Sequence, residues 1–278
     1  MAVTLKLLRP AQWLKNLMLF FPPFLAGKFF AVDGVQALAT PFVAFSLFSS
    51  SCYIVNDVFD LKADRNHPKK CYRPLPAGKI TVRQALILAL LLAVCSLLLS
   101  WLSVPDLMLW LISYFILSLA YTLWFKHLPW IDLVMIAFFF LLRLHVGGVV
   151  YHVNVTLWLY LSVFLLAIFL AAGKRLSEIT QLGDNAASHR QTLMHYSRNQ
   201  LLRIVKLTAV ASLLTYTMYC ISHHALIASI PVCAYGLYRY VRRVQQGRDG
   251  DPTTALLKDP QLLTIGVIWC VMVFSALY

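Results

Sequence analysis

Long apolar stretches recur along the whole chain, and short polar stretches separate them. Most of these stretches approach the roughly 17–25 residues that a helix needs to span a bilayer. The pattern predicts an all-α, polytopic membrane bundle of about nine transmembrane helices, in a single domain that covers residues 1–278. The expected spans lie at about 16–32, 37–55, 84–103, 106–125, 130–150, 155–173, 204–222, 225–241 and 261–278.

Composition supports a lipid environment. Of the 278 residues, 60% are hydrophobic and 13% are charged, whereas soluble domains are roughly 45–50% apolar. The first apolar stretch follows basic residues as a secretory signal would, but no small-residue cleavage site comes after it. Because Pro22 and Pro23 interrupt this stretch, we expect a retained first span with a kink. The six cysteines include no Cys-x-x-Cys pair, which predicts small buried side chains rather than metal ligands or disulfides.

Positive charge follows the loops of the predicted bundle. A net charge of +13 could indicate nucleic-acid binding, but that interpretation requires a basic face on a soluble domain. When the loops are assigned to alternate sides of the membrane, 22 of the 24 Lys and Arg residues fall on one side, and the exceptions are Lys28 and Arg143. This asymmetry predicts that the N-terminus and the long loops are cytoplasmic. We therefore expect membrane lipids, and no nucleic acid, as partners.

Four polar residues follow the second apolar stretch at close spacing: Asn56, Asp57, Asp60 and Asp64. If the second helix continues through them, a rotation of about 100° per residue places all four side chains on one face. Converging carboxylates repel one another unless a cation lies between them, and oxygen ligands suit Mg²⁺ that bridges phosphates. A solvated helix end is the alternative, but ionisable groups near membrane depth are costly and usually functional. The sequence therefore predicts a magnesium site.

Basic residues come directly after the acidic segment, and Pro74-Leu75-Pro76 predicts a turn before the next span. A diphosphate leaving group needs both features, because a metal ion bridges its oxygens while cations neutralise its charge. The basic residues are Arg65, His67, Lys69, Lys70 and Arg73.

A second polar patch ends the sixth apolar stretch, where Lys174, Arg175 and Glu178 follow one another closely. The spacing allows ion pairs within one helix, so simple pairing and phosphate binding are equal alternatives.

Three further polar features lie at or inside the spans. Arg143 lies within a span and must face a partner or a wet cavity, and Gly147 and Gly148 allow helices to approach closely there. The stretch 9–16, Arg-Pro-Ala-Gln-Trp-Leu-Lys-Asn, is either an interfacial anchor or a substrate contact. Weaker candidates flank a short cytoplasmic turn: Tyr121, Lys126 and Asp132.

The acidic motif resembles the first signature of the UbiA superfamily of intramembrane prenyltransferases, Asn-Asp-x-x-Asp-x-x-x-Asp on a nine-helix bundle. Residues 56–64 match it at every specified position. The second signature of the family, Asp-x-x-x-Asp after the sixth helix, is absent, and Gly-Lys-Arg-Leu-Ser-Glu at 173–178 takes its place. This motif and the stretch 9–16 are similar to the decaprenyl-phosphate phosphoribosyltransferase branch of the superfamily. The likeness covers nearly the whole chain.

The resemblance implies a donor, an acceptor and a location. The donor is phosphoribosyl pyrophosphate, the acceptor is a polyprenyl phosphate such as decaprenyl or undecaprenyl phosphate, and the products are polyprenylphosphoryl-5-phosphoribose and pyrophosphate. It also implies Mg²⁺, the bacterial inner membrane and, by analogy, a precursor of lipid-linked arabinofuranose. Because the acceptor is already an anion, no strong general base is required, and the chain shows no convincing nucleophile–His–Asp arrangement.

The resemblance and the spacing together suggest roles for the polar residues. Asp57, Asp60 and Asp64, assisted by Asn56, would hold Mg²⁺ on the pyrophosphate. The phosphates of the donor would be held by Lys15, Lys70, Arg73 and Lys126. Either the donor's 5-phosphate or the lipid phosphate would be held by Arg143, Lys174 and Arg175. Glu178 would orient Lys174 or Arg175, and Tyr121 would contact the ribose.

Two other functions are kept as alternatives. An aromatic prenyltransferase of the same fold would use a polyprenyl diphosphate donor, but its second carboxylate pair is missing. A transporter, a different class, would carry charged residues deep in several spans or inverted repeats, whereas the sequence shows one deep arginine and no obvious duplication. The sequence does not set the prenyl chain length, and it is compatible with a homo-oligomer.

Overall fold

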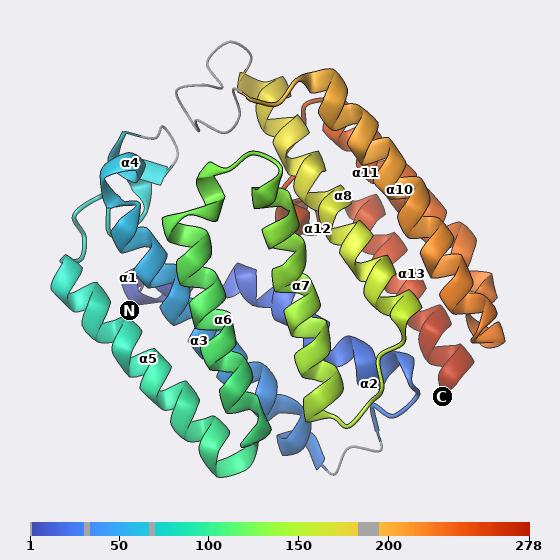
Figure 1. Ribbon diagram of the computed structural model, residues 1–278, viewed down its shortest axis with the longest axis horizontal. Helices are drawn as coiled ribbons and strands as arrows, with labels where there is room; N and C mark the ends of the chain where they lie inside the picture. The colour runs from blue at the N-terminus through green and yellow to red at the C-terminus, as the bar shows by residue number, and fades with distance from the viewer. Residues whose placement is uncertain (1, 31–33, 67–69, 183–194) are drawn as a thin grey trace.

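The computed structural model describes residues 2–30, 34–66, 70–182 and 195–278. Over these residues the protein is all-helical, and its long helices lie side by side between two ends of a bundle (Figure 1). The C-terminal ends of α3 (Gly34–Phe59), α6 (Asp106–Leu123) and α8 (Leu157–Leu182) all lie at the upper end in Figure 1. Successive long helices therefore cross the bundle in alternate directions, as a polytopic membrane protein requires.

Seven helices of the described ranges are long and apolar enough to cross a membrane. Besides α3, α6 and α8 they are α5 (Val82–Ser103), α7 (Ile131–Val150), α10 (Arg198–Ile221) and α13 (Pro260–Leu277). Seven of the nine expected spans correspond to these helices. The expected count of nine is not confirmed, because the other two expected spans are broken.

The span expected at 16–32 consists of two short helices. After α1 (Ala2–Leu8), η1 (Pro10–Phe20) is a 3₁₀ helix, and α2 (Phe21–Leu25) follows it. A 3₁₀ helix of this length is uncommon, but buried Asn16 ties η1 to α3. The expected interruption is therefore a change of helix type at Phe21, and the prolines occupy the first turn of α2, where a missing N–H costs little.

The span expected at 225–241 is also divided. It comprises η6 (His224–Ser229) and α11 (Ile230–Gln245), which begins at a proline in its first turn. The 16 residues of α11 rise about 24 Å, less than the roughly 30 Å of a hydrocarbon core. Pro231 explains the boundary, because proline suits the first turn of a helix and disrupts its interior.

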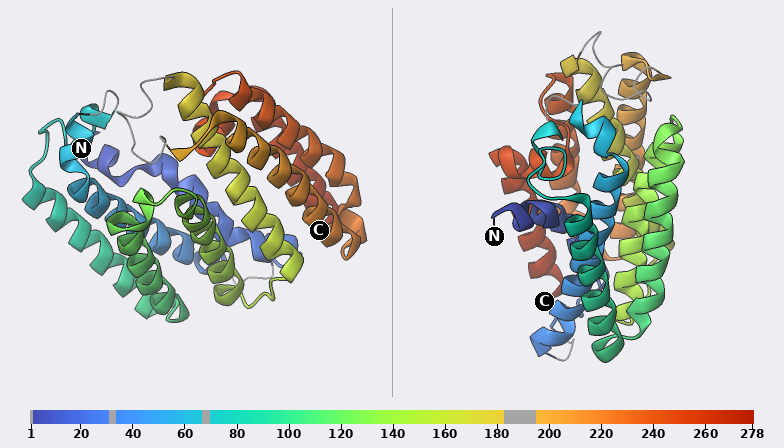
Figure 2. Two further views of the ribbon diagram at one scale, coloured as in Figure 1. Left: turned by 45° about the horizontal axis from the view of Figure 1, so that its top comes forward. Right: turned by 90° about the vertical axis from the view of Figure 1, so that its left-hand side faces the viewer.

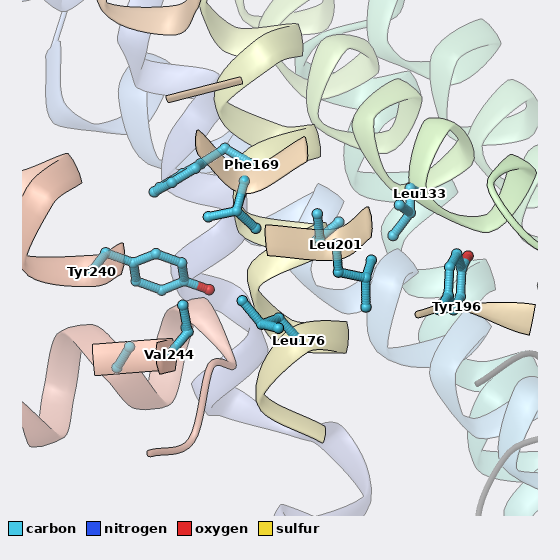
Figure 3. Packing of buried hydrophobic residues seen from close by; sticks show 11 residues of the cluster. Leu133, Phe169, Leu176, Tyr196, Leu201, Tyr240 and Val244 are labelled. Carbon is cyan, nitrogen blue, oxygen red and sulfur yellow. The ribbon is translucent and has the colours of Figure 1, made fainter. Parts of the chain in front are cut away.

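Apolar side chains occupy both the interior and the outer surface. In one core cluster, side chains of α7, α8, α10 and α11 meet around Phe169, Leu201 and Tyr240 (Figure 3). On the outside, Leu90 and Leu102 of α5 are 65% and 75% exposed, which a bilayer accommodates and water does not. The left view of Figure 2 shows α5 and α6 at one side, α10, α11 and α13 at the other, and α7 and α8 between them. All six cysteines are free, but only Cys52 and Cys220 are buried while Cys95 and Cys270 are exposed, so the prediction that the cysteines are buried is wrong for most of them.

Small residues bring the helices close together at the centre. A Cβ atom added to Gly147 would lie 2.2 Å from the backbone oxygen of Leu19, and one added to Gly148 would lie 2.8 Å from Val155. The predicted close approach at these glycines is therefore confirmed. It allows η1 to lie directly against α7 and so brings the residues of the N-terminal stretch inside the bundle.

Candidate active site

The acidic segment lies at the end of α3. Asp60 interrupts the helix with φ −86° and ψ 0°, and α4 (Leu61–Arg65) follows directly. Backbone hydrogen bonds from Asp60 N–H to the Asn56 carbonyl (2.9 Å) and from Asp64 N–H to the Asp60 carbonyl (2.8 Å) keep a helical path through the segment. Asn56 Nδ2 donates to Asp60 Oδ2 at 3.3 Å. The predicted continuation of the helix is thus nearly complete, and residues four apart meet on one face.

Asp57 and Asp64 share one arginine. Nη1 of Arg73 lies 3.1 Å from Asp57 Oδ1 and 2.7 Å from Asp64 Oδ2. The two carboxylates are 4% and 2% exposed. Each has a second cation, Arg9 beside Asp57 and Lys70 at 3.5 Å from Asp64. Neighbouring carboxylates need such counter-charges, because their repulsion is poorly screened away from water.

Asp60 has a partner from the segment after α6, and Asn56 has one from α6 itself. Lys126, in η3 (Phe125–His127), forms an ion pair with Asp60. Thr122, on α6, donates to Asn56 Oδ1 at 2.9 Å. A cleft of about 520 Å³ opens beside these contacts, and it is lined by Phe59, Asp60, Lys62, Ala63, Asn66, Thr122, Leu123, Lys126 and His127.

Arg9 is a member of this site to which the sequence assigned no individual role. Its backbone is left-handed, with φ 51° and ψ 59°, a conformation that is costly for a residue with a side chain. Its guanidinium contacts Asp57 and lies 5.5 Å from the centre of the Tyr53 ring. The signal was present in the stretch 9–16, but only the fold shows that this arginine reaches the acidic segment.

The donor set of the segment suits a hard divalent cation, since it consists of carboxylates and one amide oxygen. Within the described ranges, no group of three or more Asp, Glu, His or Cys side chains lies close enough to hold a metal ion. Asp57 and Asp64 nevertheless converge on one positive group, Arg73 Nη1. These two residues therefore fit a shared cation in chemistry and direction, whereas Asp60 faces Lys126.

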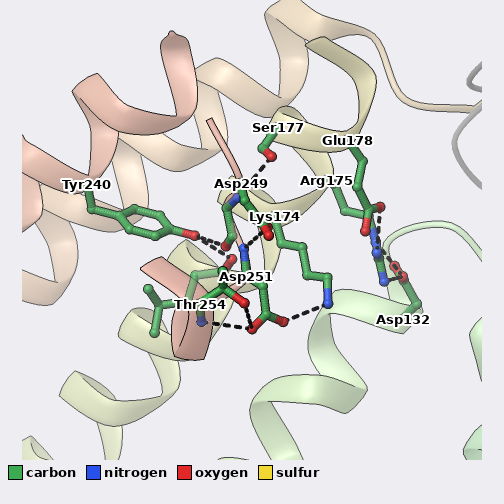
Figure 4. Close-up of polar contacts among 11 residues, drawn as sticks. Asp132, Lys174, Arg175, Ser177, Glu178, Tyr240, Asp249, Asp251 and Thr254 are labelled. Carbon is green, nitrogen blue, oxygen red and sulfur yellow. Dashed lines mark hydrogen bonds and ion pairs between the residues drawn. The ribbon is translucent and has the colours of Figure 1, made fainter. Parts of the chain in front are cut away.

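The second polar patch is held mainly by residues from other elements (Figure 4). α8 continues well beyond its expected end, so this patch is helical. Arg175 donates from Nη1 to Glu178 (2.8 Å) and from Nε and Nη2 to Asp132 of α7 (3.1 and 2.9 Å). Lys174 pairs with Asp251 at 2.9 Å. Ion pairing within the helix is thus present, and Arg175 rather than Lys174 is the residue that Glu178 contacts.

The loop that carries Asp251 is fixed by α8 and α11. Gly250 N–H donates to Ser177 Oγ (2.9 Å), and the Tyr240 hydroxyl donates to the Gly250 carbonyl (2.6 Å). A Cβ atom at Gly250 would lie 2.8 Å from the backbone of α8, so glycine is required for this approach. Burial acts to raise the pKa of Asp251, but the charge and hydrogen bond of Lys174, the charge of Lys15 and the Thr254 N–H together outweigh it and lower this pKa to about 2. The loop thus presents an ionised carboxylate to Lys174.

Arg143 lies in the interior of the bundle and is 2% exposed. Its three nitrogens donate to Asn16 Oδ1 (2.8 Å), the Phe139 carbonyl (2.7 Å) and the Tyr114 hydroxyl (2.9 Å). Of the two expected surroundings, a partner or a wet cavity, the structure shows protein partners. Its partners join η1, α6 and α7.

Lys15 and Tyr121 interact electrostatically with residues of the second polar patch. Lys15, on η1, is within electrostatic reach of Tyr53, Lys174 and Asp251, although it was expected among the cations of the acidic segment. Tyr121, on α6, is within electrostatic reach of Arg175. Two of the basic residues named from the sequence, His67 and Lys69, lie outside the described residues.

The fold and the motifs agree with those of known proteins. The UbiA prenyltransferase family matches residues 20–274. This chain belongs to that family. It is 30% identical, over 99% of its length, to decaprenyl-phosphate phosphoribosyltransferase of Mycobacterium tuberculosis, 94% of which is covered. It is 31% identical, again over 99% of its length, to the Corynebacterium glutamicum protein of the same name, 86% of which is covered.

A solved structure shows the same fold. The UbiA homolog from Archaeoglobus fulgidus bound to DMAPP and Mg²⁺ matches with a TM-score of 0.74 at 18% identity and covers 98% of both chains. The chain belongs to the UbiA family, and its described residues include seven helices long enough to cross a bilayer, so it is an integral membrane protein.

Proposed function

We propose that this UbiA family protein transfers 5-phosphoribose from phosphoribosyl pyrophosphate to a polyprenyl phosphate. An oxygen of the acceptor phosphate forms a bond to C1 of the ribose as the bond from C1 to the pyrophosphate oxygen breaks. The strongest support is the 30% and 31% identity, over 99% of the chain, to decaprenyl-phosphate phosphoribosyltransferases. The Lys-Arg pair at 174–175, where the second acidic signature of the family is missing, supports a donor other than a prenyl diphosphate.

The acidic segment is the proposed place for the pyrophosphate of the donor. Asp57 and Asp64 would hold Mg²⁺, which would supply charge neutralisation for the leaving group. Asp60 faces Lys126, and Asn56 donates to Asp60, so these two would support the site rather than bind the metal. The cations that pair with these carboxylates would also bind the phosphate oxygens. They are Arg9, Lys70, Arg73 and Lys126.

The second patch is the proposed place for the other phosphate, either the donor's 5-phosphate or that of the lipid. Lys15, Lys174 and Arg175 would donate to it, and Tyr121 would contact the ribose between the two groups. Arg143 is left out of this set, because it lies 11 residues further along α7 than Asp132, about 16 Å away along the helix axis, where it donates to Asn16, the Phe139 carbonyl and Tyr114. It holds η1 against α7 instead.

The charge balance of the site supports a need for a divalent cation. Among the described residues, four cations face three carboxylates at the acidic segment, and three cations face three carboxylates at the second patch. The protein groups are thus almost neutral as a set. A donor with several phosphate charges needs further positive charge, which Mg²⁺ would supply.

The proposed reaction needs positioning more than proton transfer. The attacking phosphate oxygen is already an anion, so no general base is assigned. C1 becomes oxocarbenium-like as pyrophosphate leaves, and fixed cations stabilise the charge that develops on the leaving group. We place the site at the cytoplasmic face, where 22 of the 24 Lys and Arg residues are expected.

Purified protein, Mg²⁺, phosphoribosyl pyrophosphate labelled in the ribose and a panel of polyprenyl phosphates test the proposal. The expected result is labelled lipid together with released pyrophosphate, and both are lost when the metal is chelated. No labelled lipid from any acceptor would refute it. Transfer of a prenyl group to an aromatic acid would replace it with the aromatic prenyltransferase alternative.

A further inference from the structure

Arg175 is held by a set of hydrogen bonds that begins outside its own helix. The Arg175 side chain is 4% exposed and that of Asp132 is 0% exposed. Both Nε and Nη2 of Arg175 donate to the same oxygen of Asp132, Oδ2. Because Asp132 lies in the first turn of α7, this contact joins α8 to the beginning of α7.

Tyr196 occupies the other oxygen of Asp132. Its hydroxyl donates to Asp132 Oδ1 at 2.5 Å and accepts the backbone N–H of Trp130 at 2.8 Å. The Tyr196 ring packs edge-on against the Trp130 ring, with 4.7 Å between the centres. Burial raises the pKa of Tyr196, and the hydrogen bond to Asp132 raises it further. The hydroxyl therefore remains a donor over any working pH.

The backbone beside this set is strained. Trp130 has φ 65°, and its side chain makes no capping hydrogen bond to α7. A non-glycine residue keeps such a conformation only where the surrounding structure enforces it, and such positions cluster at functional sites. Here the Trp130 N–H donates a hydrogen bond to the Tyr196 hydroxyl, which stabilises this conformation. The same hydroxyl donates to Asp132, the residue that binds Arg175.

The geometry points to Asp132 and Tyr196 as positioning residues that aim Arg175 at a phosphate group of a substrate. An arginine offers five N–H donors in a rigid plane. Among the described residues, Asp132 takes two of them and Glu178 takes one, which leaves two for a phosphate in a direction set by Asp132. This inference rests on the proposed function and extends it to two residues outside the motifs.

The Tyr196→Phe variant tests the inference, because it removes only the hydroxyl. A matched control is Tyr216→Phe, near the other end of α10, where the hydroxyl also has two partners, Ser229 and Trp269. We expect kcat/KM of Tyr196→Phe to fall about tenfold, as for a lost hydrogen bond to a charged group, and the control to stay within about twofold. When donor and lipid are varied separately, the substrate whose KM rises carries the phosphate that Arg175 holds.

A double-mutant cycle separates positioning from a purely structural role. In an Arg175→Lys background, Tyr196→Phe or Asp132→Asn should cost less than about twofold further, because both act through Arg175. Equal losses in both backgrounds would overturn the inference, as would unchanged kinetics of Tyr196→Phe in otherwise wild-type protein.

A binding measurement does not depend on turnover. Inorganic phosphate should raise the apparent melting temperature of the wild type and of Tyr216→Phe, and should raise that of Tyr196→Phe by clearly less. Equal shifts in all three proteins would count against positioning. Absence of labelled lipid from the wild type would instead refute the proposed function, so the two failures are distinguishable.

Discussion

Arg73 is the residue whose removal most directly tests the charge balance of the acidic segment. One of its nitrogens bridges Asp57 and Asp64, at 3.1 and 2.7 Å. In an Arg73→Gln variant the two carboxylates would keep only Arg9 and Lys70 as counter-charges. We therefore expect the variant to be less stable than the wild type without a divalent cation, and to regain most of the difference when Mg²⁺ is added.

The size of the effect follows from burial. Removing one partner from a fully buried ion pair costs about 3–5 kcal/mol. Arg73 itself is 32% exposed, and each carboxylate keeps a second cation, so about 2–3 kcal/mol is expected here. For a chain of this size that corresponds to a fall of about 5–10 °C in melting temperature.

The measurement is the apparent melting temperature of the purified protein in detergent, with and without Mg²⁺. Arg83→Gln is the matched control, because Arg83 is an exposed arginine in the first turn of α5, where such a change alters stability by about 0.5 kcal/mol at most. If Arg73→Gln had the same melting temperature as Arg83→Gln both with and without Mg²⁺, Arg73 would not be neutralising the charge of these carboxylates. A lower melting temperature that Mg²⁺ does not restore would argue against a metal site here.

Three further predictions address the site and the fold. Asp64→Ala should abolish turnover while the protein still purifies as a folded species, and near-normal turnover would exclude its role as a metal ligand. Gly147→Ala should strongly destabilise the protein, because its Cβ would lie 2.2 Å from the Leu19 carbonyl oxygen. Gly266→Ala should be tolerated, because the nearest atom to its Cβ is 3.7 Å away. Equal expression levels and melting temperatures of the two variants would contradict this. The pKa of Asp251 is lowered from 3.8 to about 2. The ionised carboxylate therefore stabilises the fold by about 2 kcal/mol above pH 4, and this stabilisation is lost as the pH falls through 2. Asp251→Asn should therefore melt below the wild type at pH 7 and converge with it near pH 2, and a constant gap would refute the assignment.

The helices could be predicted because their apolar stretches are long and nearly continuous. α5, α6, α7 and α13 begin and end within about two residues of the expected bounds. The acidic face could be predicted as well, because residues four apart on a helix must be neighbours. Gly147 is a similar case, since a glycine within a span indicates close packing before the partner helix is known.

The broken elements were harder to predict from local pattern. The stretch 16–32 is apolar enough for a span, yet η1 is a 3₁₀ helix held by hydrogen bonds from Asn16 to α3 and from Arg143 to Asn16. These partners lie far away in sequence, and hydropathy contains no information about them. The end of α8 was predicted too early because its last turns are polar, and a polar stretch does not look like part of a span. In the structure these turns are covered by α7 and by the loop before α12 (Pro252–Lys258).

The sequence alone determined the all-helical membrane fold, the acidic motif and the likeness to the UbiA family, because each depends on residues that lie close together along the chain. The tertiary structure decided which charges meet. It brought Arg9 to Asp57, Asp132 and Tyr196 to Arg175, and Asp251 to Lys174. In a low-dielectric interior each buried charge must find a partner, and that partner is chosen by the packing of helices rather than by spacing in the sequence.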